Sequence, residues 1–322
     1  MPLDVAPRRA PPSGFAEDVR VGLCGAGQKA LPPKYLYDTL GSALFEAITR
    51  LPEYGLWRAE RSLLRKRGAE IADRIRARNV IELGSGSANK TIELLEALLA
   101  QGPVSYCAID LSPTALDMTR RELAGMRGLS VRGIEGEYLS ALAAAMRSAR
   151  PRGRSLVLFL GSSLGNLGPR ASRHFLRRIR EQLRSDDGLL LGADLEQSAP
   201  RLLAAYDDAL GVTAAFNLNL LVRMNRELGA NFSLPQFRHR ARFNEAARDV
   251  EMHLESQRAQ DVNIAALGQS VSFRASETIH SESSHKYSAA ELDQLLAEAG
   301  FRCEARWLDR EWPFCSGLYL AE

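Results

Sequence analysis

Cysteine is scarce in this sequence, and none of the patterns that it usually serves is present. The four cysteines are widely scattered, no two form a CxxC pair, and no histidine stands at metal-ligand spacing from any of them. This spacing argues against a disulfide framework and against a zinc site, so we expect no bound metal. Cys107 lies in the apolar run SYCAID and is expected to be a small buried hydrophobe.

Long apolar runs are also lacking. No segment approaches the roughly 20 apolar residues that cross a bilayer. The N-terminal stretch MPLDVAPRRAPPSGF has no apolar region of a secretory signal. Its prolines and small residues predict a flexible lead-in, which we place at residues 1–30. We therefore expect a protein of the reducing cytoplasm with no membrane partner.

A large excess of one charge is missing as well, because the formal net charge is only +3. The densest basic run, RHFLRRIREQLR, carries Phe175, Ile179 and Leu183 at helical spacing. This pattern predicts an amphipathic helix whose arginines face solvent. The sequence also has no NPPY-type loop and no track of aromatic and basic residues, so we expect no nucleic-acid partner.

With 322 residues, the chain exceeds the size of most single cores, which favours two domains or one domain with a large insertion. Five short, largely apolar stretches alternate with amphipathic ones: NVIELGSGS as strand then turn, VSYCAIDLS, LSVRGIEGEY, SLVLFLGSSLGNL as strand then loop, and GLLLGADLE. This alternation predicts a buried parallel sheet in a doubly wound domain. Residues 201–227 are predicted to be helical, and residues 250–282 alternate polar and apolar positions as antiparallel strands do. We therefore predict a small inserted α+β domain, after which the tail resumes helix and strand.

The first predicted strand ends in the glycine-rich segment ELGSGS, Glu82 to Ser87. Glycine tolerates positive φ and lets a ligand approach the backbone closely. The segment does not match GxGxxG, because Asn89 stands at the third glycine position, and no P-loop GxxxxGK is present. By itself the motif is equally consistent with a structural turn.

Acidic residues at the next two strand ends favour a ligand site. Asp110 ends the second strand, where a carboxylate can accept both hydroxyls of a ribose. Glu137 and Tyr138 follow the third strand, where an adenine would lie. Asp110 alone could be an acid near a helix start, but the combination predicts a nucleoside cofactor, and S-adenosylmethionine in particular.

At this point the chain resembles a known family, the histidine-specific N-α-methyltransferases that form hercynine in ergothioneine biosynthesis. The resemblance runs from about Leu31 to the C-terminus. It is carried by LPPKYLYDTLGSALFEAITRLPEY, ELGSGSANKT, FLGSSLGNL, AYDDALGVTAAFN, NRELGANF, VEMHL and ETIHSESSHKYS. It implies an α/β fold, with a Rossmann-like class I methyltransferase sheet and a smaller inserted α+β domain. The implied division is residues 31–198 plus 286–322 for the cofactor and residues 199–285 for the substrate.

The resemblance also implies roles for individual residues. Those at cofactor positions of the family are Gly84, Lys90, Asp110, Glu137 and Tyr138. Those expected around the substrate's amino and carboxylate groups are Tyr54, Gly161, Asn166 and Tyr206, with Tyr37 and Phe45 lining the pocket. Those expected at the imidazole are Met252, Glu282 and Ser284. The chain departs from the family in having GEY in place of GDF, and GLWR directly after Tyr54.

These residue types suit methyl transfer to an amine, which depends mainly on positioning a neutral lone pair behind the methyl group. We assign the catalytic roles to Asn166, whose amide can both donate and accept, and to Tyr54, a candidate proton acceptor. Tyr206 could donate to the substrate carboxylate, and no lysine or arginine is expected in this set. Glu282 could accept an imidazole N–H, and Ser284, on the same face of a strand, could hold the other ring nitrogen.

Without the resemblance, each of these residues has an ordinary structural interpretation. Glu282 would be a charge on a polar edge, Tyr206 and Met252 would be core residues, and Asn166 would be a turn residue. With the resemblance, the function expected is trimethylation of the α-amino group of L-histidine by a monomeric enzyme. The alternatives are a betaine synthase acting on tyrosine or tryptophan, and a catalytically silent S-adenosylmethionine-binding protein.

Overall fold

The computed structural model describes residues 14–149 and 153–322, so residues 1–13 of the expected lead-in lie outside the described residues. Its larger unit is built on a seven-stranded sheet in the order β12-β13-β6-β5-β2-β3-β4. The strands are β2 (Asn79–Leu83), β3 (Val104–Asp110), β4 (Leu129–Glu135), β5 (Ser155–Phe159), β6 (Gly188–Asp194), β12 (Phe301–Asp309) and β13 (Phe314–Ala321). Strands β2 to β6 are parallel, whereas β13 is antiparallel to both of its neighbours. The predicted Rossmann-like class I sheet is confirmed.

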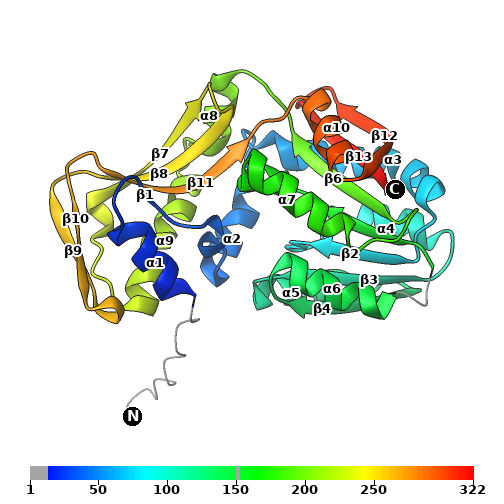
Figure 1. The fold of residues 1–322 in the computed structure, drawn as a ribbon, viewed down its shortest axis with the longest axis horizontal. Helices are drawn as coiled ribbons and strands as arrows, with labels where there is room; N and C mark the ends of the chain where they lie inside the picture. Colours follow the sequence, from blue (N-terminus) through cyan, green and yellow to red (C-terminus); the bar gives the residue numbers. More distant parts are fainter. Residues whose placement is uncertain (1–13, 150–152) are drawn as a thin grey trace, which may run out of the picture.

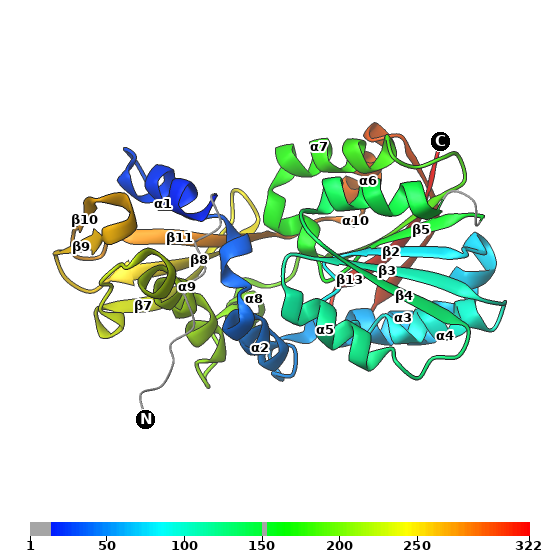
Figure 2. The same cartoon turned by 90° about the horizontal axis from the view of Figure 1, so that it is seen from below.

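Helices cover both faces of this sheet (Figure 2). One layer holds α3 (Gly55–Ile75), α4 (Ile92–Leu99) and α5 (Pro113–Glu122); the other holds α6 (Tyr138–Ala149), α7 (Pro169–Arg180) and α10 (Ala289–Glu298). Because both faces are covered, β2, β5 and β6 are buried along their whole length. In α7, Phe175 and Ile179 are buried and Arg173, Arg177 and Arg178 are exposed, as the sequence pattern predicts.

The smaller unit is built on a four-stranded sheet in the order β1-β11-β8-β7, with a separate hairpin of β9 and β10 (Figure 1). The strands are β1 (Lys29–Ala30), β7 (Phe237–Asn244), β8 (Asp249–Ser256), β9 (Gln260–Ile264), β10 (Gln269–Phe273) and β11 (Thr278–His285). Its helices are α1 (Phe15–Cys24), α2 (Thr39–Ile48), α8 (Ala199–Tyr206) and α9 (Val212–Leu228). Short 3₁₀ turns cover Pro33–Leu36, Ser163–Leu167, Leu234–Gln236 and Ala265–Leu267.

The helical stretch predicted over residues 201–227 is divided in two. Helix α8 ends at Tyr206, and Gly211, with φ of +73°, precedes α9. The carboxylate of Asp208 accepts hydrogen bonds from the backbone N–H groups of Val212 (3.0 Å) and Thr213 (2.8 Å). An acid that caps the first turn of α9 therefore separates the two helices.

The prediction of a flexible lead-in is wrong for residues 15–30. Phe15, Val19 and Leu23 form a fully buried stripe on α1, and β1 pairs in parallel with β11. Burial of three such side chains contributes about 1.5–3 kcal/mol each, which ties this segment to the smaller unit. Helix α2 also packs against α9. We therefore propose that residues 15–48 belong with residues 199–285, in place of the division implied by the resemblance.

Three further observations concern the described residues only. The four cysteines, all within the described ranges, are free. No helix in residues 14–149 and 153–322 is long and apolar enough to cross a membrane. Among the same residues, no group of three or more histidine, cysteine, aspartate or glutamate side chains is placed to hold a metal ion.

Candidate active site

A cavity of about 910 Å³ lies between the two units, at the carboxyl ends of the parallel strands. Its volume is in the range of small-molecule sites. Every predicted site residue except Met252 lines it: Tyr37, Phe45, Tyr54, Gly84, Lys90, Asp110, Glu137, Tyr138, Gly161, Asn166, Tyr206, Glu282 and Ser284. Met252 is buried on β8, opposite Glu282 in the ladder, and does not line the cavity.

The glycine-rich loop follows β2 and crosses the end of β3. Gly84 has φ of +76°, and a Cβ there would lie 2.8 Å from the Tyr138 Oη, so both backbone conformation and space favour glycine. Gly86 also has positive φ but has open space beside it. Beneath the loop, the buried carboxylate of Glu82 accepts hydrogen bonds from the hydroxyls of Thr91 (2.8 Å) and Tyr106 (2.5 Å). Glu82 therefore holds the loop from below rather than reaching the cavity.

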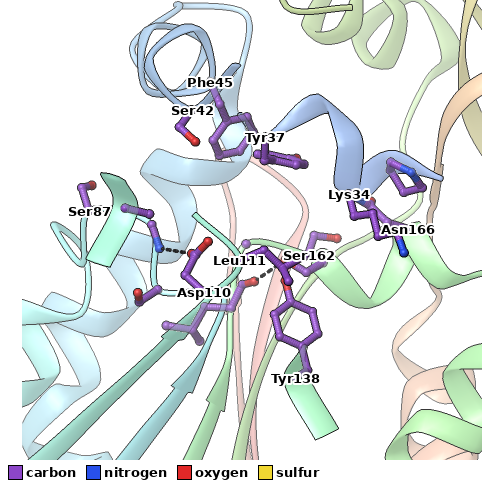
Figure 3. A pocket seen from close by; sticks show the side chains of 18 of the residues that line it. Lys34, Tyr37, Ser42, Phe45, Ser87, Asp110, Leu111, Tyr138, Ser162 and Asn166 are labelled. Carbon is purple, nitrogen blue, oxygen red and sulfur yellow. Dashed lines mark hydrogen bonds between the residues drawn. The ribbon is translucent and has the colours of Figure 1, made fainter. Parts of the chain in front are cut away.

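Asp110 is held at the end of β3 by the same loop (Figure 3). Its carboxylate accepts hydrogen bonds from the backbone N–H groups of Gly86 (3.1 Å) and Ser112 (2.9 Å). Burial raises the pKa of Asp110, and these N–H groups act in the opposite direction. Two bonds leave further lone pairs on the carboxylate, which can accept from a ligand hydroxyl. Tyr138 lies on the same side of the cavity as Asp110, whereas Tyr37 and Phe45 lie across it.

Lys90 is held by a buried acid that sequence reasoning missed. Glu60, on α3, has no exposed side-chain surface and forms an ion pair with Lys90. Both of its carboxylate oxygens also accept from the backbone N–H of Gly161, at 3.0 and 2.9 Å. A sequence signal existed, because Glu60 falls among Leu56, Ala59, Leu63 and Leu64, on the apolar stripe of its helix.

Glu46 is a second acid that the sequence analysis did not single out. It lies on α2 in the smaller unit and lines the cavity. Its carboxylate accepts a hydrogen bond from the hydroxyl of Ser87 in the glycine-rich loop, with an oxygen–oxygen distance of 2.8 Å. This bond connects the two units directly at the site.

Aromatic rings from the smaller unit and from the start of α3 form one wall. Ring centroids are separated by 5.5 Å between Tyr37 and Phe45, 6.3 Å between Phe45 and Tyr54, and 6.1 Å between Tyr54 and Tyr206. Burial raises the pKa of Tyr54 well above its ordinary value, and the nearby Tyr206 and Glu282 act in the same direction. Its phenol therefore stays protonated near neutral pH. A Tyr54 phenolate is thus disfavoured as the proton acceptor, and hydrogen bonding is the role left to this side chain.

Glu282, on β11, is the acid that the smaller sheet contributes to the cavity. Its side chain is only 6% exposed. Burial raises its pKa to about 7, with Lys286 acting in the opposite direction. The amide Nδ2 of Asn166 donates to its Oε1 at 2.9 Å. Asn166 and Glu282, which are predicted for different parts of the substrate, therefore contact each other directly.

The hydroxyl of Tyr206 has two partners within the protein, and its expected bond to a substrate carboxylate stays a prediction. Tyr206 donates to the Ser284 Oγ at 2.9 Å and accepts from the Lys286 Nζ at 2.9 Å. Lys286 has no exposed side-chain surface and is paired with the equally buried Asp194, at 2.8 Å. Lys286 does not line the cavity, so the expectation of no lysine or arginine among the substrate-holding residues stays a prediction.

Comparisons with known proteins show the family of this chain. A family profile described as histidine-specific methyltransferase, SAM-dependent, matches residues 15–321. The chain is 42% identical over 299 residues to a histidine N-alpha-methyltransferase of Mycobacterium tuberculosis, covering 91% of this chain and 90% of the relative. It is also 42% identical over 306 residues to a protein of that name in Mycolicibacterium smegmatis, covering 94% and 93%. Ergothioneine biosynthesis protein 1 of Schizosaccharomyces pombe is 31% identical over 288 residues, covering 86% of this chain and 37% of that protein.

Proposed function

This chain belongs to the family of histidine-specific, SAM-dependent methyltransferases, and from this premise we propose that it trimethylates the α-amino group of L-histidine. The product is hercynine, and the reaction is the first step of ergothioneine biosynthesis. The observation that carries the proposal is one cavity lined both by Asp110, the acid at the end of β3 in the larger unit, and by the buried acid Glu282 on β11 of the smaller unit.

The cofactor end fits S-adenosylmethionine. Asp110 keeps unused lone pairs for ribose hydroxyls, and the open space beside Gly86 lets a ligand reach the loop backbone. Lys90 can contact the carboxylate of the methionine part, because Glu60 holds its ammonium at the cavity. When bound, S-adenosylmethionine supplies an electrophilic methyl group. No metal is required for this chemistry.

The amine of the substrate must be neutral and held in line with that methyl group, at a separation of about 3–3.5 Å. Tyr54 and Asn166 are the polar side chains that we propose for this positioning. Tyr54 keeps its proton, because burial raises its pKa, and its oxygen can still accept an amine hydrogen. As methyl groups replace the hydrogens of the amine, Tyr54 loses donors but adds no charge to the site.

Glu282 is proposed to select the side chain of the substrate. Its carboxylate accepts one bond from Asn166 and can accept a second from an imidazole N–H. An imidazole carries its N–H on a five-membered ring, whereas a phenol or an indole presents its donor on a larger side chain, which favours histidine over tyrosine and tryptophan. Both alternatives remain outcomes of the experiment below.

The test is an incubation of the purified protein with S-adenosylmethionine and one amino acid at a time, read by mass spectrometry. We expect one, two and three added methyl groups on histidine and little addition to tyrosine or tryptophan. Faster methylation of tyrosine or tryptophan would contradict the substrate assignment. Cofactor binding without turnover of any amino acid would instead support the silent binding protein.

The localisation, the oligomeric state and the absence of other partners are also predictions. We propose a cytoplasmic monomer that acts on the free amino acid, with no nucleic-acid or membrane partner. Sedimentation of the purified protein, with and without both substrates, would test the monomer.

A further inference from the structure

Lys286 is the least expected charge near the site. Its side chain and that of Asp194 have no exposed surface, and their Nζ and Oδ2 atoms are 2.8 Å apart. Burying an ion pair is costly unless further hydrogen bonds compensate. Those bonds exist, because the Lys286 Nζ also lies 2.9 Å from the Tyr206 Oη and 2.8 Å from the Ser284 Oγ. The ammonium group therefore donates to two hydroxyls and lies in ion-pair contact with one carboxylate oxygen.

The pair is anchored on the side away from the cavity. The other carboxylate oxygen of Asp194 accepts the indole N–H of Trp312 at 2.7 Å. Asp194 is the last residue of β6, and Lys286 directly follows β11, so the pair joins the central strands of one unit to the strand that carries Glu282 and Ser284. Lys286 is thus fixed in place by both sheets.

Ser284 accepts two hydrogen bonds in this arrangement. An ammonium group can only donate, so Tyr206 and Ser284 both accept from Lys286. Tyr206 then donates its own proton to the Ser284 Oγ. Two accepted bonds occupy both lone pairs of that oxygen, and no bond within the described part of the chain uses the Ser284 proton. Ser284 lines the cavity, so this proton is available to a ligand that binds there.

The wall of the cavity therefore presents an acceptor and a donor two residues apart on one strand. Glu282 can accept an N–H, and Ser284 must donate to a bare lone pair. A neutral imidazole has one N–H and one unprotonated ring nitrogen, which matches this pair. A ring with N–H but no second nitrogen would leave the Ser284 proton unpaired in a desolvated place.

We propose that Lys286 is a positioning residue that fixes Ser284 as a hydrogen-bond donor and so makes the site select a neutral ring with both an N–H and a bare nitrogen. The proposal rests on the proposed function, because it concerns how the same cavity recognises the side chain of histidine. It assigns Lys286 no contact with either substrate.

The test uses histidine analogues in which one ring nitrogen becomes C–H. These are β-(pyrrol-2-yl)alanine and β-(pyrrol-3-yl)alanine, and one of the two keeps the N–H that faces Glu282 whichever way the ring lies. For the wild-type protein we expect kcat/KM for histidine to exceed that for the better analogue by about 10- to 100-fold, the effect of one unsatisfied buried donor. In Lys286→Met, the Ser284 hydroxyl is free to rotate away from the ring of the analogue. The kcat/KM for histidine should then exceed that for the better analogue by no more than about threefold.

Two further variants address folding. Lys286→Met/Asp194→Asn removes both buried charges and keeps an amide oxygen for the Trp312 N–H. Ser284→Ala leaves the ion pair intact and removes the proton itself. Both should lose the preference for histidine over the pyrrole. As a matched control, Trp312→Phe disturbs the same buried cluster but spares Lys286 and both hydroxyls, so stability should fall while the preference remains.

A purely structural role for Lys286 would lower kcat/KM for both ring types in parallel and leave their ratio unchanged. That result in the Lys286 variants, or an undiminished preference in Ser284→Ala, would overturn the proposal. Absence of any histidine methylation by the wild-type protein would instead contradict the proposed function. The two failures are therefore distinguishable.

Discussion

Replacement of Glu282 by glutamine should make the free protein more stable while making it a poorer enzyme. Burial raises the pKa of Glu282 from its usual 4.5 to about 7. Between these values the folded protein binds a proton that the unfolded chain has released, so stability falls as pH rises through this window. The difference corresponds to at most about 3 kcal/mol above pH 7. Glu282→Gln removes this cost and still offers an amide oxygen to Asn166.

The same substitution removes the charge that strengthens the bond to the imidazole N–H. A charge-assisted hydrogen bond is about twice as strong as a neutral one, so kcat/KM for histidine should fall about tenfold in Glu282→Gln. Glu282→Ala removes the acceptor altogether and should cost about 100-fold for histidine, with little loss for amino acids that do not use this bond. The preference for histidine would then decrease.

The assay is urea denaturation at pH 5 and pH 8, together with methylation kinetics at one pH. At pH 8 the midpoint for Glu282→Gln should exceed that of the wild type, and at pH 5 the two should nearly coincide. Glu60→Gln is a matched control, since this buried acid has a cationic partner in Lys90 and its loss should destabilise the protein. A Glu282→Gln protein that is no more stable at pH 8 would refute the burial argument. Full histidine preference in Glu282→Ala would refute the recognition argument.

Three other predictions follow from single contacts. Asp110→Ala should weaken binding of S-adenosylmethionine about 10- to 100-fold without weakening binding of histidine, which calorimetry would measure; unchanged cofactor affinity would contradict the ribose assignment. Phe15→Ala should destabilise the fold by about 3–5 kcal/mol in urea denaturation, whereas a loose N-terminal segment would give no effect. At Gly192 a Cβ would lie 1.8 Å from the Glu60 Oε1, so Gly192→Ala should displace Glu60 and reduce cofactor binding. The control is Gly125→Ala, where an added Cβ meets nothing within 4 Å. Equal cofactor binding by the two variants would exclude an effect of Gly192 on the cofactor through Glu60.

The cofactor end of the site could be predicted from the sequence because its determinants are local. Glycines after a buried strand and acids at successive strand ends predict a nucleoside site, since the carboxyl ends of parallel strands meet at one edge of a sheet. The resemblance added the substrate residues, and all of these except Met252 line the cavity. The side-chain period of two along β11 placed Glu282 and Ser284 on one face, and it also places Lys286 there, although that residue was not singled out.

Other features were decided only by the tertiary structure, because they depend on residues that are distant in sequence. Residues 15–30 have no strong sequence signal for a helix or strand. Their apolar stripe is buried on folding, with Phe15 packed against Tyr35, and β1 pairs with β11. Glu60 and Lys286 have charges that composition alone assigns to the surface; they are buried because Lys90 and Asp194 arrive from other strands and loops to pair with them. The sequence by itself determined which chemistry the strand ends can bind. The tertiary structure decided which donors and acceptors meet, because hydrogen-bond partners come from residues that are distant in sequence.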